Sequence, residues 1–462
     1  MTGQRTREEP TGIWDPRIVW VTVGAVALIF LSAMQALAVT TVMPVVSQEL
    51  DGAALYAVAF SATLATSVIG MVATGAWADR AGPVAPLYAS TALFVIGLLI
   101  AGLAVSMELL VAGRLVQGLG AGGQTVALYV VVARVYPPAL HGRVFAAFSA
   151  AWVVPSLIGP FLAGAVAEFL HWRWVFLGVA VLTLIAFAMV AIKLRGIDLD
   201  SDAPAANGSV AVRLVLAVIV AAGVLALSLS GELPALGVAA AAASLLVIAL
   251  AARPLLPRGT LRAGRGLPSV VLMRGLIAGT LFGAEIYVPY LLIDRYEFSP
   301  TWAGLGLTTA ALAWAGFADI QGRFGDRLGN TRITLIGIAL LSASTAIACA
   351  TALLGWAPWV LIAGWTLAGA GMGLMYPRLT VLTLAYSTPQ NQGFNSSALS
   401  ISDSIGASAT IAIMGLVFTA LHAADAGFPA VFAIATALAL LALIPGLRLG
   451  HAHEVSTQKT AQ

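Results

Sequence analysis

The sequence predicts an all-α polytopic membrane protein. Hydrophobic residues make up 60% of the chain and charged residues only 9%, against roughly 25% charged residues in soluble domains. The apolar stretches run for about twenty residues, the length that a helix needs to cross a bilayer. A transmembrane β-barrel would instead show alternation of period two over short segments. Because unpaired backbone groups are costly in hydrocarbon, helices are the spanning structure that fits.

Apolar runs of spanning length fall into two groups of six, separated by a central pair. The expected helices are 18–43, 53–76, 83–104, 107–134, 142–168 and 172–194, then 211–230 and 234–252, then 270–293, 300–321, 331–354, 357–385, 393–420 and 427–447. The predicted count is therefore fourteen. The corresponding domains are an N-terminal segment 1–17, a six-helix bundle 18–195, linkers with the central pair 196–268, a second bundle 269–447 and a tail 448–462.

The distribution of basic residues predicts the orientation, because Lys and Arg near span ends are retained on the cytoplasmic side. With a cytoplasmic N-terminus, nineteen of the 23 Lys and Arg residues, Arg274 included, fall in inner loops. Only Arg173 and Arg295 fall in outer loops, and Arg114 and Arg378 lie within spans. We expect a multi-pass protein of a bacterial-type cytoplasmic (inner) membrane with both termini cytoplasmic.

Several function classes find no support in the sequence. The net charge of +3 comes from scattered loop residues, which gives no basis for a nucleic-acid partner. Cys349 is the single cysteine, so an intramolecular disulfide is excluded. The chain has no H-E-x-x-H, no G-x-x-x-x-G-K-[ST] and no Cys/His set, so we expect neither an enzyme, nor a metal site, nor ATP drive. A channel would need a ring of like polar groups, which the sequence does not offer.

The two groups of six helices look like copies of one design. The loop pattern G-x-x-x-D-R-x-G occurs after the second helix of each group, at Gly75, Asp79, Arg80 and Gly82 and again at Gly322, Asp326, Arg327 and Gly329. Glycines of the fourth helices correspond at a constant offset, Gly118 with Gly369 and Gly122 with Gly373. The same offset relates Gly142 to Gly393. Such duplication is common in transporter folds.

Two further motifs complete a resemblance to a known family. The fourth span carries Leu110-x-x-x-Arg114-x-x-Gln117-Gly118, and the fifth carries Pro155, Gly159, Pro160 and Gly164. With the loop motif, these make the chain resemble the major facilitator superfamily, specifically its fourteen-span drug:proton antiporter branch. The resemblance implies the major facilitator fold, with two pseudo-symmetric six-helix bundles plus two extra central helices. It also implies alternating access by a monomer, with small-molecule substrates and protons as partners and no cofactor beyond the proton gradient.

The resemblance assigns roles to the motifs. Asp79 and Asp326 would hold the inward face shut while the neighbouring arginines bind inner carboxylates; the alternative is a simple turn with a solvated ion pair. The chain departs from the family at Pro83 and Val84, where basic residues usually follow. The fifth-helix motif would bend the helix, expose a smooth face between the halves and favour antiport, although a merely kinked helix is the alternative.

Carboxyl groups within spans are the candidates for carrying a proton, because low dielectric favours their neutral form. Glu285 lies near the middle of its span, Asp403 about ten residues into its own, and Asp319 nearer the inner end. The family's acidic residue of span one is replaced here by Gln35. We therefore hypothesise that Glu285 is the primary proton carrier and Asp403 the secondary one. The alternatives for Glu285 are a permanent pair with an arginine and a fixed charge for substrate.

Arg114 lies inside a span, where an unpaired charge costs at least ~2.5–3.5 kcal/mol. The resemblance gives it a role in proton coupling, and the alternative is a structural hydrogen-bonding hub with Gln117. Spans one, four, nine and twelve should line the substrate cavity. The candidate lining residues are Gln35, Arg114, Tyr287, Tyr290, Trp365 and Tyr376.

Aromatic faces beside an acidic residue suit cationic or amphipathic compounds, although Trp and Tyr also serve as interface anchors. The expected function is export of hydrophobic, drug-like compounds in exchange for protons, the activity of multidrug efflux and antibiotic resistance. A lipid or metabolite exporter of the same fold is the competing prediction.

Overall fold

The computed structural model describes residues 12–52, 55–194, 209–230, 233, 236–298, 300–422 and 425–449. The first bundle contains α1 (Val19–Glu49), α2 (Tyr56–Ala81), α3 (Val84–Gly102), α4 (Met107–Val135), α5 (Pro138–Phe169) and α6 (Arg173–Leu194). The central segment contains α7 (Val210–Leu229), α8 (Gly237–Ala252), η3 (Arg253–Leu255) and η4 (Thr260–Arg262). The second bundle contains α9 (Leu267–Glu285), α10 (Tyr287–Tyr296), α11 (Pro300–Leu328), α12 (Asn330–Leu354), α13 (Pro358–Ala385), α14 (Gln392–His422), α15 (Gly427–Leu441) and α16 (Leu443–Gly446).

Every apolar run expected to span corresponds to a helix in the described part of the chain, so the all-α prediction is confirmed. Twelve helical segments among the described residues are long and apolar enough to cross a membrane. Helices α5 and α11, with 32 and 29 residues, are not among those twelve. The total of fourteen spans therefore stays a prediction, as do the domain boundaries.

Two expected spans are each interrupted by a helix break, and proline explains both breaks. The run expected at 270–293 is split between α9 and α10 at Ile286. Pro289 has no N–H to offer the carbonyl of Glu285 four residues earlier, and its ring crowds that carbonyl. Pro445 stands in the same relation to Leu441, where α15 ends. Glu285 is therefore the last residue of α9, directly at a helix break.

Glycines let the helices of each bundle approach closely, in the same way in both halves. A Cβ on Gly118 or Gly122 would collide with backbone of α2, and one on Gly120 with backbone of α3. In the second bundle, Gly369 and Gly373 stand in the same relation to α11, and Gly371 to α12. The duplicated glycines thus make equivalent contacts, and the close packing expected from Gly118 and Gly122 is present.

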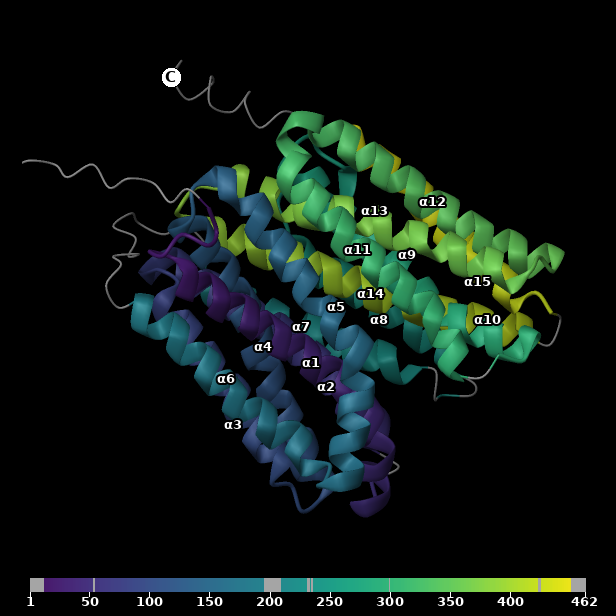
Figure 1. Ribbon diagram of the computed structural model, residues 1–462, viewed down its shortest axis with the longest axis horizontal. Coiled ribbons are helices and arrows are strands. Elements are labelled where there is room, and N and C mark those ends of the chain that lie inside the picture. Colours follow the sequence, from purple (N-terminus) through teal and green to yellow (C-terminus); the bar gives the residue numbers. More distant parts are fainter. Residues whose placement is uncertain are drawn as a thin grey trace, which may run out of the picture.

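The bundles lie side by side and contact each other at one end (Figure 1). This end carries the α2–α3 and α11–α12 turns, and we call it the inner end because the sequence predicts it to be cytoplasmic. There α2 packs on α14 and α5 on α11. Figure 1 shows the opposite, outer ends of the two bundles diverging. The two bundles therefore meet at the inner end and are separated at the outer end.

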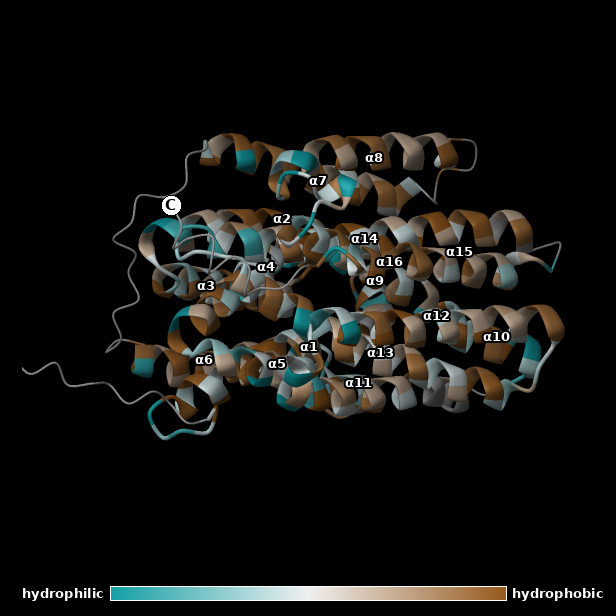
Figure 2. Cartoon of the chain, turned by 90° about the horizontal axis from the view of Figure 1, so that it is seen from above, coloured by the Kyte–Doolittle hydropathy of each residue, from teal (hydrophilic) through white to brown (hydrophobic). Residues whose placement is uncertain are grey.

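The central pair lies outside the two bundles. Figure 2 shows α7 and α8 as a separate layer over α2 and α14. Helix α7 packs on α2 of the first bundle and also touches α14 of the second. The pair therefore lies across a seam between the halves rather than between the two cores.

The outer end of the first bundle is tied together by Glu49, the last residue of α1. Its carboxylate accepts hydrogen bonds from Trp172 Nε1 and Arg173 Nη1, both at 2.8 Å. The bond from Arg173 holds the pKa of Glu49 below its usual range. Arg173 also donates to the carbonyl of Ala104 at 2.9 Å. Three loops are thus joined, which favours movement of this bundle as one unit.

Substitution of Gly122 by Ala should destabilise the protein, because the added Cβ would meet the backbone of Ser67. We expect a loss of about 1–3 kcal/mol, as for other overpacked positions, seen as a lower Tm in thermal unfolding of the detergent-solubilised protein. Gly178→Ala is the matched control, because no heavy atom lies within 4 Å of a Cβ built there. Equal Tm values for the two variants would contradict the packing described here.

Candidate functional site

The loop motif of the first bundle closes the inner end through a helix cap. Asp79, in the last turn of α2, is buried, and its carboxylate accepts from the backbone N–H groups of Gly393 at 2.6 Å and Phe394 at 2.9 Å. These N–H groups belong to the first turn of α14, where a helix lacks internal acceptors. A negative charge is favoured at that position by the helix dipole. We call this contact the inner gate.

The glycines of the loop motifs permit the halves to meet. A Cβ on Gly75 would lie 2.5 Å from the carbonyl oxygen of Gly393, and a Cβ on Gly322 would lie 3.1 Å from that of Gly142. The motif glycine of each half thus lies against the fifth helix of the other half. Gly82 and Gly329 have φ values of 76° and 80°, which glycine adopts without strain.

An arginine outside the loop motif forms hydrogen bonds to both halves near the inner gate. Arg80 and Arg327 are exposed, and neither forms an ion pair within the described residues. Arg134, near the end of α4, instead donates to the carbonyls of Ala78 at 3.2 Å and Pro389 at 3.1 Å, and so joins the halves. The side chain of Asp326 lies outside the described residues.

A buried ion pair lies between α9 and α14. Arg274 Nε donates to Asp403 Oδ1 at 2.7 Å, and the side chains are 2% and 20% exposed. The hydroxyl of Tyr376 donates to Asp403 Oδ2 at 2.9 Å, and the guanidinium carbon of Arg274 lies 3.1 Å from the centroid of the Tyr376 ring. Asp403 is therefore held by both an arginine and a tyrosine. The sequence prediction counted Arg274 among the loop arginines because it is near a span end. In the structure Arg274 lies inside α9, where the carboxylate of Asp403 balances its charge.

The ion pair also contacts the first bundle. Tyr129 of α4 lies close enough to Arg274 and Asp403 to interact electrostatically with both. Its ring packs edge-on against Phe145, with centroids 5.2 Å apart. The ion-pair cluster, Tyr129, Arg274, Tyr376 and Asp403, therefore joins the two bundles. No sequence signal separates Tyr129 from the other aromatic residues of the apolar helices, so sequence reasoning missed it.

Glu285 lies eleven residues after Arg274 on α9. Eleven residues are three helical turns, so the two side chains leave the same face about 16 Å apart. That face points between α13 and α14, because Arg274 bonds to Tyr376 and Asp403. Glu285 is partly exposed and makes no hydrogen bond or ion pair among the described residues. A permanent pair with an arginine, one of the sequence alternatives, is therefore absent in this arrangement.

Arg114 is buried and bonded like a structural hub. Its Nε donates to the carbonyl of Ala59 at 3.0 Å and its Nη1 to Gln117 Oε1 at 2.9 Å. Gln35 is also buried, yet its amide finds no partner in the described chain. Asp319 is exposed and pairs with Arg323 one turn away, at 2.8 Å. Roles for these residues in proton coupling or substrate binding stay predictions.

The aromatic candidates separate into different environments. Tyr287 and Tyr290 belong to a cluster at the outer end of the second bundle, with ring centroids 5.0 Å and 5.3 Å from that of Phe418. Tyr376 belongs to the ion-pair cluster. Trp365 is fully buried in the core of the second bundle. Of these four side chains, Tyr290 alone is exposed, and a shared cavity lining stays a prediction.

The fifth-helix motif glycines lie next to α1. A Cβ on Gly159 would lie 3.4 Å from Met34 Sδ, and one on Gly164 would lie 3.8 Å from Thr41. Both neighbours belong to α1 of the same bundle, while α5 also packs on α11 of the other bundle, so the expected face between the halves stays a prediction. Their lack of bulk lets α1 approach α5. Pro155 is buried within an uninterrupted helix, and the side chain of Pro160 lies outside the described residues.

The comparisons with known proteins agree with this architecture. The profile of the Major Facilitator Superfamily matches residues 25–321 and 270–461. The chain belongs to the Major Facilitator Superfamily. Its members are multi-pass membrane transporters of small molecules, and the fold described above is that of the superfamily.

Individual members of the superfamily are similar to this chain at modest sequence identity. The multidrug efflux pump SdrM of Staphylococcus aureus is 24% identical over 406 residues, which cover 86% of this chain and 89% of that protein. The MFS efflux transporter aclA of Aspergillus oryzae is 33% identical over 184 residues, 38% of this chain and 33% of that protein. A bacterial homologue of the iron transporter ferroportin, solved in its outward-facing state, has a TM-score of 0.70 at 13% identity, covering 93% and 99% of the two chains. The last likeness concerns the fold alone.

Replacement of Asp403 by Asn should destabilise the protein, because Arg274 would keep a buried positive charge without its counter-charge. Breaking such a pair costs about 3–5 kcal/mol, which thermal unfolding in detergent would detect. The double variant Arg274→Gln/Asp403→Asn should lose less than the two single variants together. Arg323→Gln, which breaks an exposed pair, is the control and should cost below about 0.5 kcal/mol. Additive losses in the double variant would contradict direct pairing.

Proposed function

We propose that this protein is a secondary active transporter that exports hydrophobic or amphipathic compounds in exchange for protons by alternating access. It belongs, in this proposal, to the fourteen-span drug:proton antiporter branch. It works as a monomer in a bacterial-type cytoplasmic membrane, with both termini inside and no cofactor besides the proton gradient. The observation that carries the proposal is the position of Asp403, a partly exposed carboxylate whose arginine partner interacts electrostatically with Tyr129 of the opposite bundle.

Protonation of Asp403 changes the contact between the bundles. The neutral acid no longer balances Arg274, whose charge then has only the carbonyl of Tyr376, Thr380 and Tyr129 as polar partners among the described residues. Asp403 lies ten residues after Gly393 on α14, about 15 Å from the inner gate. A shift of α14 in response to the charge change would act directly on the helix turn that Asp79 caps. Proton binding and gate opening are coupled in this way.

Glu285 is the primary proton carrier in this mechanism, and Asp403 is the secondary one. It lies about 16 Å from Arg274 towards the outer end, where the bundles diverge, and it has no fixed partner among the described residues. Protons arriving from outside reach Glu285 before Asp403. A compound leaving outwards meets the same carboxylate, so substrate and proton compete for one negative charge. Such competition is the minimal requirement for exchange rather than cotransport.

The competing function is export of a lipid or metabolite by the same fold. Efflux relatives and the aromatic cluster of Tyr287 and Tyr290 beside Glu285 favour amphipathic or cationic compounds, through stacking and cation–π attraction. Competition among candidate substrates in proteoliposomes distinguishes the two functions. Displacement by structurally unrelated cationic compounds supports drug export, whereas displacement only by one class of lipid or metabolite supports the alternative.

Replacement of Glu285 by Gln should abolish proton-driven export while leaving expression intact, because the amide cannot take up and release a proton. The measurement is uphill export, together with proton release on substrate addition, in vesicles with an imposed pH gradient. Asp294→Asn, which removes an exposed carboxylate from the neighbouring helix α10, is the matched control and should keep both activities. Full uphill export by the Glu285→Gln variant would reject Glu285 as a proton carrier.

A further inference from the structure

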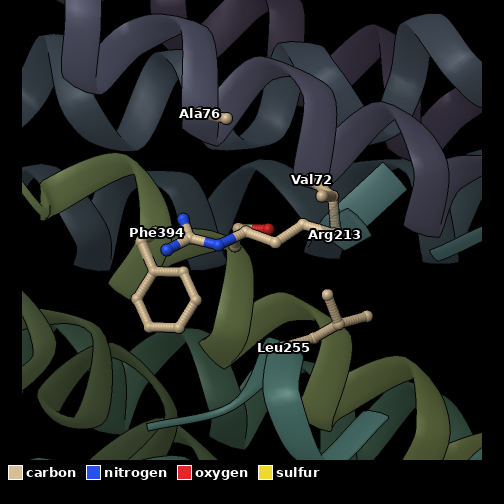
Figure 3. Close-up of a pocket in the computed structure, with 6 residues that line it drawn as sticks. Val72, Ala76, Arg213, Leu255 and Phe394 are labelled. Carbon is tan, nitrogen blue, oxygen red and sulfur yellow. The ribbon is translucent and has the colours of Figure 1, made fainter. Parts of the chain in front are cut away.

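Helix α7 places an arginine at the seam between the bundles. Arg213 lies in the first turn of α7, which Ser209 caps by accepting from the N–H of Val212 at 3.4 Å. The guanidinium carbon of Arg213 lies 4.8 Å from the centroid of the Phe394 ring, a cation–π distance. Figure 3 shows this side chain extending between α2, with Val72 and Ala76, and the ring of Phe394.

Arg213 also acts on the inner gate. Among the described residues, Arg134 and Arg213 both lie close enough to attract the carboxylate of Asp79 electrostatically. Asp79 bonds to the N–H of Phe394 at 2.9 Å, and Arg213 covers the ring of that same residue. The first turn of α14 is thus held from α2, α4 and α7 together. Two of these helices belong to the first bundle, and the third belongs to the central pair.

The space around Arg213 is too small for a ligand. The cavity there has a volume of about 10 Å³ and is lined by Val72, Ala76, Arg213, Leu255, Phe394 and Ser397. A single water molecule needs a cavity of at least roughly 10–15 Å³. The arginine side chain therefore fills the seam itself. Its role follows from the contacts that it makes with both bundles, not from binding a substrate.

We propose that α7 is a strap that stabilises the closed inner gate, and that Arg213 is its positioning residue. Arg213 contacts Phe394 of one bundle while attracting Asp79 of the other. If α2 and α14 separate, the guanidinium cannot keep both interactions. The closed state alone gains from Arg213, so its removal shifts the population towards the open inner gate. This inference rests on the alternating access of the proposed function, but not on proton coupling or on the identity of the substrate.

Alkylation of a cysteine in the seam measures gate opening without any substrate or proton gradient. Cys349 is the single cysteine, so Cys349→Ala gives a cysteine-free background. Ser397→Cys then adds a thiol at the seam; the Ser397 hydroxyl is buried and has no partner among the described residues, so no hydrogen bond is lost. The reagent is N-ethylmaleimide, applied to the full-length protein in proteoliposomes, and the readout is the labelling rate.

In this background, Arg213→Gln should raise the labelling rate about 3-fold, the factor expected for loss of one weak cation–π contact. Arg213→Lys, which keeps the charge but not the planar group, should fall between Arg213→Gln and the parent. Arg253→Gln removes a charge from the exposed end of the same helix pair and should leave the rate unchanged. If the loss of any arginine charge from this helix pair loosened the fold, the labelling rate of the Arg253→Gln control would rise as well.

Phe394→Leu removes the other partner and should raise the rate similarly, while the double variant Arg213→Gln/Phe394→Leu should add little more. If Arg213→Gln gives no folded protein, the Phe394→Leu variant decides the question alone. A labelling rate in the Arg213→Gln or Phe394→Leu variant equal to that of Arg253→Gln overturns the strap. Absence of proton-driven export by the parent protein, together with the expected labelling response of the variants, would instead count against the proposed function only.

Discussion

The cost of leaving a polar group without a partner in an apolar surrounding governs this structure. It makes the spanning segments helical, and it leaves the first N–H groups of every helix in need of an acceptor. The carboxylate of Asp79 supplies that acceptor to α14, a helix of the other bundle. The same constraint joins Arg274 to Asp403. The contacts that hold the halves together are therefore those that satisfy buried charge, and changing that charge changes the contact between the halves.

Each copy of the duplicated loop motif contacts the fifth helix of the other bundle. Gly75 of the first loop motif lies against Gly393 of the second bundle, and Gly322 of the second motif lies against Gly142 of the first. The two contacts are not equal, since the first is the tighter of the pair and is reinforced by Asp79. The pseudo-symmetric design thus contains one closer and one looser glycine contact. The closer contact, between α2 and α14, is also the one that α7 overlies.

Much of the fold could be predicted from the sequence because it depends on local composition. Runs of apolar residues fix the helices, and the repeated glycines point to close packing in each bundle. The break after Glu285 was missed, although Pro289 four residues later gives the physical reason. The positions of α7 and α8 could not be predicted, because their apolar faces carry no information on which helices they pack against.

The candidate site was predictable only in part. Asp79, Asp403 and Glu285 stand out as rare charges in apolar segments, and each occupies a distinct position in the structure. Arg274 was assigned to a loop because counting charges near span ends ignores pairing. Tyr129, Arg134 and Arg213 act through partners far away in sequence, which no local pattern reveals. The closeness of Gly159 to α1 could not be predicted either, because the motif does not say which neighbouring helix each of its glycines faces.

The layer formed by α7 and α8 makes the two flanks of the molecule unequal towards the surrounding lipid. At one junction, between α2 and α14, α7 packs on both helices. At the other junction, between α5 and α11, the central pair makes no comparable contact. In a bilayer, acyl chains beside the second junction would meet α5 and α11 directly. Acyl chains beside the first junction would meet α7 and α8, which cover α2 and α14. The two lipid-facing sides of this transporter therefore differ, although its two bundles are related by near-twofold symmetry.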